Sequence, residues 1–162
     1  MRNFKRKSLL LLFILVLGIV FLKIFKTPSP GVQSCKVPSV VIVTKVIDGD
    51  TVIVEGGYSV RLLGIDTDER GEPCYEEAKE YLEDLVLGRE VRLERDEEDV
   101  DKYGRCLRYI FVDGKNVNLE LVRKGLAVAR FYLPNVKYHK EITNAEEMAI
   151  KEKIGCKWRR KD

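Results

Sequence analysis

Acidic and basic side chains that could act together on a phosphate ester occur in three short segments of this 162-residue chain. The segments are Asp48-Gly49-Asp50-Thr51, residues 61–69 and residues 101–105. Carboxylates are the hard oxygen ligands that calcium prefers, and guanidinium groups bind phosphate through paired hydrogen bonds. These residue types therefore predict a metal-assisted site that cleaves phosphodiesters.

The candidate metal ligands are Asp50, Asp66 and the backbone carbonyl of Thr67. Asp50 lies in a turn between two predicted strands, where Asp-Gly-Asp could also be an ordinary tight turn. Asp66 ends the next predicted strand, where a carboxylate is costly unless it is solvated, paired or bound to metal. With added water molecules these oxygens suit Ca²⁺, and Asp48 is expected to be a turn residue or to support the ligands.

Three further side chains are candidates for catalysis. Glu69 lies three residues past Asp66 and could remove a proton from an attacking water, although an ordinary loop glutamate is the alternative. Arg61 lies in an apolar stretch and needs an anionic partner, which could be a scissile phosphate or a structural carboxylate. Arg105 follows a Tyr-Gly turn, and both arginines could stabilise negative charge on phosphorus.

The pattern along the chain predicts the elements that must position these residues. Beta-branched runs and turn signals predict strands at residues 39–46, 51–54, 58–65, 89–93 and 106–112, the last ending in an Asp-Gly hairpin turn. Helices are predicted before Gly88, at residues 118–124, and from an N-cap at Asn144 to Gly155. This order predicts an α+β fold, a five-stranded oligonucleotide-binding (OB-fold) barrel with three helices.

The first 26 residues differ in composition from the rest of the chain. Basic residues flank an uncharged apolar run from Leu9 to Leu22. We therefore predict a signal segment or membrane anchor at residues 1–26, a linker at 27–36 and the folded domain at 37–162. No small-residue cleavage site directly follows the run, so we expect an uncleaved anchor with an extracytoplasmic domain, and secretion after cleavage is the alternative.

Charge and cysteine content restrict the partners of the domain. Six of the 29 basic residues lie in the leader, so the other 23 face 26 acidic residues and the domain has a net charge of −3. Phosphate binding must then come from a local cluster. The four cysteines favour disulfides in an exported segment, with all pairings open, and a single histidine makes zinc binding improbable.

The order and spacing of the three segments resemble the thermonuclease (staphylococcal nuclease) family, from about Val41 to Trp158. The resemblance implies metal binding by Asp50, Asp66 and Thr67, catalysis by Glu69, Arg61 and Arg105, and nucleotide contacts from Lys102, Tyr103 and Tyr132. It also implies calcium-dependent cleavage of DNA and RNA by water attack on phosphorus, with 3′-phosphate products. We expect a monomer whose partners are DNA, RNA and, through the leader, the membrane.

Some residues depart from the family pattern. Asp68 stands where the family usually has proline, and the loop between Glu69 and the first helix is shorter than in the best-known members. The resemblance places Cys74 at the first helix and Cys156 at the packed carboxyl end, which makes Cys74–Cys156 the preferred disulfide. Two other functional classes are alternatives, namely a catalytically silent barrel that binds nucleic acid or protein and a structural surface domain. Neither accounts for the complete set of charged residues.

Overall fold

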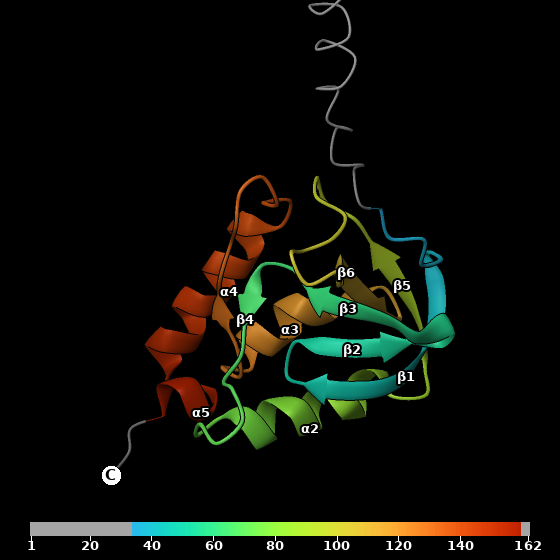
Figure 1. Ribbon diagram of the computed structural model, residues 1–162. Helices are drawn as coiled ribbons and strands as arrows, with labels where there is room; N and C mark the ends of the chain where they lie inside the picture. Colours follow the sequence, from blue (N-terminus) through green and yellow to red (C-terminus); the bar gives the residue numbers. More distant parts are fainter. Residues whose placement is uncertain (1–33, 160–162) are drawn as a thin grey trace, which may run out of the picture. The chain divides into compact units, whose positions relative to one another are not determined.

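Beta-branched segments of the chain close into a small barrel (Figure 1). The structure is a computed structural model that describes residues 34–159, so the predicted leader lies outside the described residues. The barrel strands are β1 (Val40–Asp48), β2 (Thr51–Val54), β3 (Tyr58–Leu62), β5 (Glu90–Glu94) and β6 (Cys106–Val112). They pair in the order β3-β2-β1-β5-β6, and a parallel pairing of β3 with β6 closes the barrel. The prediction of a five-stranded α+β barrel is confirmed.

The third strand is shorter than predicted. It ends at Leu62 instead of residue 65, because Gly64 adopts a φ of +76°. A Cβ atom at Gly64 would lie 2.8 Å from the Phe131 ring, so glycine is also required by space. The chain then forms β4 (Ile65–Asp66), which pairs with β8 (Val128–Ala129) outside the barrel sheet. This change of direction places Asp66 at the rim of the barrel.

One helix lies between the third and fourth barrel strands, and the others follow the last barrel strand. The helices are α2 (Tyr75–Val86), α3 (Val117–Arg123), α4 (His139–Glu152) and the short α5 (Gly155–Trp158), with a 3₁₀ turn η1 (Glu55–Gly57). The predicted hairpin turn after β6 is confirmed, since it leads to β7 (Lys115–Asn116). Among residues 34–159, no helix is long and apolar enough to cross a membrane.

The predicted N-cap of the third helix at Asn144 is wrong. Helix α4 begins at His139, and the residue before it, Tyr138, makes no side-chain cap hydrogen bond. The Tyr138 ring instead packs edge-on against Tyr109, with ring centroids 4.7 Å apart. Tertiary packing of an aromatic side chain therefore fixes this helix start, and no capping signal marks it in the sequence.

Two disulfides connect segments that are distant in the sequence. Cys74 pairs with Cys156, which confirms the preferred pairing, and Cys35 pairs with Cys106. The sequence separations are 82 and 71 residues. Closing loops of this length in the unfolded chain stabilises the fold by about 4 kcal/mol per bridge in the chain-entropy model.

Glu94, at the end of β5, joins the barrel to the segment before α4. Its carboxylate accepts hydrogen bonds from Tyr138 at 2.6 Å and Arg92 at 2.6 Å, and it lies 2.8 Å from the Lys137 ammonium. Burial alone would raise the pKa of Glu94, but these three donors outweigh it and lower the pKa to about 2. The ionised carboxylate therefore stabilises the folded state.

Replacing Glu94 by glutamine should lower the free energy of unfolding by about 2 kcal/mol at pH 7. Because the folded-state pKa is lowered, the contribution is complete above the unfolded pKa near 4.5 and is lost as the pH falls towards 2. Denaturant unfolding of wild type and variant at several pH values measures this difference. Glu97→Gln, at an exposed position on the following loop, is the control. A Glu94→Gln effect that stays constant between pH 7 and pH 2 would contradict the assignment.

Candidate active site

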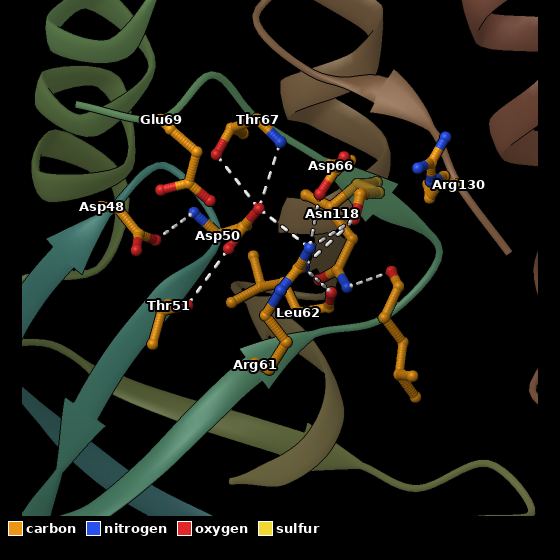
Figure 2. A network of polar contacts seen from close by, with 12 residues as sticks. Asp48, Asp50, Thr51, Arg61, Leu62, Asp66, Thr67, Glu69, Asn118 and Arg130 are labelled. Carbon is orange, nitrogen blue, oxygen red and sulfur yellow. Dashed lines mark hydrogen bonds and ion pairs between the residues drawn. The ribbon is translucent and has the colours of Figure 1, made fainter. Parts of the chain in front are cut away.

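Arg61 lies between the two predicted metal-binding aspartates (Figure 2). Its Nη2 atom lies 3.0 Å from Asp50 Oδ2 and 2.9 Å from Asp66 Oδ1. The same guanidinium donates to the carbonyl oxygens of Leu62 at 2.6 Å and Ile65 at 3.1 Å. Arg61 therefore has carboxylate partners in the structure and draws both aspartates to one guanidinium, while phosphate binding by Arg61 stays a prediction.

The pairing of β2 with β3 determines this arrangement. Thr51 is directly opposite Arg61 in the antiparallel ladder, and the Leu62 N–H donates to the Asp50 carbonyl at 2.8 Å. In the turn before β2, Asp48 accepts a hydrogen bond from the Asp50 N–H at 3.1 Å. Asp48, the last residue of β1, thus stabilises the turn, in line with one of its two expected roles. Gly49 allows close packing there, because a Cβ atom would lie 2.8 Å from Ala78 of α2.

The Asp50 carboxylate is buried and contacts donors through both of its oxygens. Oδ2 accepts from the backbone N–H and the hydroxyl of Thr67, each at 3.1 Å, and Oδ1 accepts from the Thr51 hydroxyl at 3.1 Å. Burial raises the pKa of Asp50 to about 6, with a further increase from Asp48, while Arg61 opposes the shift. A second positive charge beside this carboxylate would favour its ionised form.

The residues at this position fit a hard divalent cation. In residues 34–159 no group of three or more His, Cys, Asp or Glu side chains forms a ready-made metal cage. Two carboxylates share one guanidinium, however, so the Asp50–Arg61–Asp66 cluster has a net charge of −1 when both are ionised. Carboxylate and carbonyl oxygens with water completing the shell suit Ca²⁺. The assignment of Asp50, Asp66 and Thr67 as ligands stays a prediction.

Glu69 lies on the exposed loop between β4 and α2. Figure 2 shows its carboxylate on the same side of the site as those of Asp48 and Asp50. Its backbone N–H donates to Glu72 Oε2 at 2.6 Å, and the Glu72 N–H donates to the Glu69 carbonyl at 2.9 Å. The turn therefore presents Glu69 to solvent near the carboxylates of Asp48 and Asp50, where a water molecule can approach.

A cavity of about 510 Å³ adjoins the cluster on the Arg61 side. Its lining includes five of the predicted catalytic and substrate-binding residues, namely Arg61, Lys102, Tyr103, Arg105 and Tyr132. Both tyrosines are well exposed, at 72% for Tyr103 and 65% for Tyr132. Glu69, Asp50 and Thr67 are not part of this lining. The structure thus separates a cationic, aromatic cavity from the carboxylates, and Arg61 contacts both.

Arg105 is held at the edge of this cavity by Asp101. Its Nε lies 2.6 Å from Asp101 Oδ2, and its backbone N–H donates to Asp101 Oδ1 at 2.9 Å. Burial would raise the pKa of Asp101, but the hydrogen bonds from Arg105 and Tyr103 lower it overall. Arg105 Nη1 also lies 3.5 Å from the Thr51 hydroxyl, which itself donates to Asp50. The guanidinium is therefore fixed towards the cluster.

Two residues of the site were not predicted from the sequence. Arg130 lines the cavity and donates from Nε to the Tyr132 hydroxyl at 3.1 Å. Asn118 was predicted only as a helix residue, but it is fully buried, and its Nδ2 donates to the Leu63 carbonyl at 2.8 Å. The signal for Asn118 was its polar side chain between apolar neighbours at the start of a helix.

Comparisons with known proteins agree with this geometry. Residues 59–159 match the family model described as staphylococcal nuclease homologue. The chain is 37% identical to a thermonuclease of Staphylococcus hyicus, covering 67% of this chain and 70% of the relative. It is 38% identical to a thermonuclease of Staphylococcus intermedius, with 74% and 76% covered. Endonuclease YncB of Bacillus subtilis is 37% identical, with 80% and 67% covered. The chain therefore belongs to the staphylococcal nuclease family.

Replacing Asn118 by alanine should lower the free energy of unfolding by about 2–4 kcal/mol, because the buried Leu63 carbonyl loses its donor and the buried Ile110 N–H loses its acceptor. Urea denaturation monitored by tryptophan fluorescence measures the loss. Asn116→Ala is the matched control, since Asn116 only caps α3 through the Leu119 N–H and should cost about 1 kcal/mol. Equal losses in the two variants would show that Asn118 does not support the β3 end as described.

Proposed function

We propose that this chain is a calcium-dependent nuclease that hydrolyses DNA and RNA by water attack on phosphorus and leaves 3′-phosphate products. Membership of the staphylococcal nuclease family makes it a phosphodiesterase of the endonuclease type. The observation that supports the finer assignment is the position of Arg61, which contacts the carboxylates of Asp50 and Asp66 and also lines the cationic cavity. A phosphate in that cavity would lie beside the proposed metal ligands.

Each polar side chain has a role in the proposed reaction. Glu69 removes a proton from the attacking water, and it is exposed enough for that water to reach it. Arg61 and Arg105 stabilise the negative charge that develops on the phosphoryl oxygens and the leaving 5′ oxygen. A calcium ion at Asp50, Asp66 and the Thr67 carbonyl would supply further positive charge beside the phosphate.

The cavity binds the nucleotides on either side of the cleaved bond. Lys102 supplies positive charge for the backbone, and the exposed rings of Tyr103 and Tyr132 offer flat surfaces on which bases or sugars can stack. Stacking does not distinguish the bases strongly and tolerates both deoxyribose and ribose. This supports action on both DNA and RNA.

We further propose that the enzyme is a monomer that acts outside the cytoplasm, tethered by residues 1–26 or released after their cleavage. Two disulfides within the described residues support an oxidising compartment, because such bonds are rare in a reducing cytosol.

The decisive test measures cleavage of single-stranded DNA by the purified full-length chain, with calcium and with chelator. Glu69→Gln should lower kcat by about 10²- to 10⁴-fold, because the general base is lost while the shape of the side chain is kept. Glu76→Gln, an exposed glutamate in the first turn of α2, is the matched control and should keep wild-type activity.

Full activity of Glu69→Gln would contradict the role of Glu69 as general base. Absence of cleavage by the folded wild type with every divalent metal tried would contradict the enzyme itself. Retention of the wild type on nucleic acid under those conditions would then favour a silent binding domain.

A further inference from the structure

The loop that presents Glu69 is bound at two points to the carboxyl-terminal segment of the chain. Residues 67–74 connect β4 to α2. Asp68 forms an ion pair with Lys157 of α5, and Cys74 forms a disulfide with the neighbouring Cys156. These two contacts join residues that are 82 and 89 positions apart in the sequence, one near each end of the loop.

The Asp68–Lys157 ion pair is largely shielded from water. The side chains are 13% and 19% exposed, respectively, so the pair differs from the mobile ion pairs of an open surface. Asp68 Oδ2 also accepts a hydrogen bond from the Cys74 N–H at 3.0 Å. One carboxylate therefore connects both ends of the loop to each other and to α5. Removing either partner takes one opposite charge away from a shielded group.

Glu69 directly follows two fixed residues. Thr67 donates from its backbone N–H to the buried Asp50 carboxylate at 3.1 Å. Asp68, the next residue, is held by Lys157. The Glu69 side chain itself is exposed, so its position depends on the backbone at residues 67 and 68. Movement of Asp68 would displace the Glu69 carboxylate.

The segment that holds Asp68 is itself anchored to the body of the domain. The Lys157 N–H donates to the Gly125 carbonyl at 3.1 Å, at the turn after α3. The preceding residue, Cys156, is covalently bonded to Cys74 at the start of α2. The Lys157 ammonium therefore extends from a fixed backbone and can restrain the loop.

We propose that Lys157 is a positioning residue for hydrolysis: through Asp68 it holds the backbone at residues 68–69, so that the Glu69 carboxylate lies where it can take a proton from the attacking water. This rests on the proposed role of Glu69 as general base. The Cys74–Cys156 disulfide keeps the other end of the loop in place, so loss of the ion pair displaces residues 68–69 while the domain stays folded. Lys157 does not touch the substrate.

The test uses the full-length chain with calcium and single-stranded DNA, well below the unfolding temperature. Lys157→Met keeps the length of the side chain and removes the charge, and it should lower kcat by about 10- to 100-fold while KM changes less than about twofold. Asp68→Asn should have a similar effect, and the double variant should be no worse than either single variant, because both remove the same contact. Lys157→Arg should restore most of the activity.

Arg159→Met is the matched control, because it breaks the neighbouring ion pair with Glu77 but leaves Asp68 in place. It should lower the unfolding temperature slightly and keep the wild-type kcat. An equal loss of kcat in Arg159→Met and Lys157→Met would overturn the inference, because the loss would then follow general weakening of the carboxyl end. A wild-type kcat in Lys157→Met would overturn it as well.

Amide hydrogen exchange separates this inference from the proposed function. Lys157→Met should accelerate exchange at the Glu69 and Glu72 amides and leave the Asn118-bonded Ile110 amide protected. Unchanged exchange at Glu69 and Glu72 overturns the inference whatever the activity. If the wild type shows no cleavage but Lys157→Met still accelerates exchange in the loop, the proposed function is contradicted and the restraint of the loop by Lys157 is supported.

Discussion

A buried carboxylate, Asp50, is the constraint on which the rest of this site depends. Ionised Asp50 is costly at 6% exposure unless positive charge and hydrogen-bond donors surround it. Arg61 supplies the charge, and the hydroxyls of Thr51 and Thr67 supply donors from two different segments. Satisfying this one carboxylate therefore fixes the β2–β3 register and the start of the following loop. The same contacts leave a cluster with excess negative charge beside a cationic cavity.

The backbone around the cluster is shaped so that Asp66 also reaches Arg61. The left-handed conformation at Gly64 turns the chain out of β3, and Asn118 binds the Leu63 carbonyl just before that turn. The pairing of β4 with β8 then holds Asp66 at the rim, where its side chain is 43% exposed. One aspartate is thus buried and the other is open to solvent, an arrangement that fits the proposed binding of a hydrated cation.

Local signals in the sequence were sufficient for the barrel but not for all of its details. Strands 51–54 and 106–112 were predicted to the residue, because β-branched runs end there at turn residues. The start of α4 and the end of β3 were mispredicted, since an aromatic contact of Tyr138 and the crowding around Gly64 are tertiary features. For the same reason, the Asp68–Lys157 pair, 89 residues apart, has no sequence signal. The family pattern identified the candidate site residues, whereas the direct contact of Arg61 with both aspartates is visible only in the fold.

The most direct test of this account is a calcium titration by isothermal calorimetry of the wild type, Asp50→Asn and Asp48→Asn. The amide keeps the shape of the side chain, so Asp50→Asn removes mainly charge, and the Asp48 variant changes the charge of a turn residue two positions away. We predict that wild type and Asp48→Asn bind calcium with similar affinity and that Asp50→Asn binds at least about tenfold more weakly. Equal affinity of Asp50→Asn and wild type would contradict the claim that the buried carboxylate cluster is the metal site.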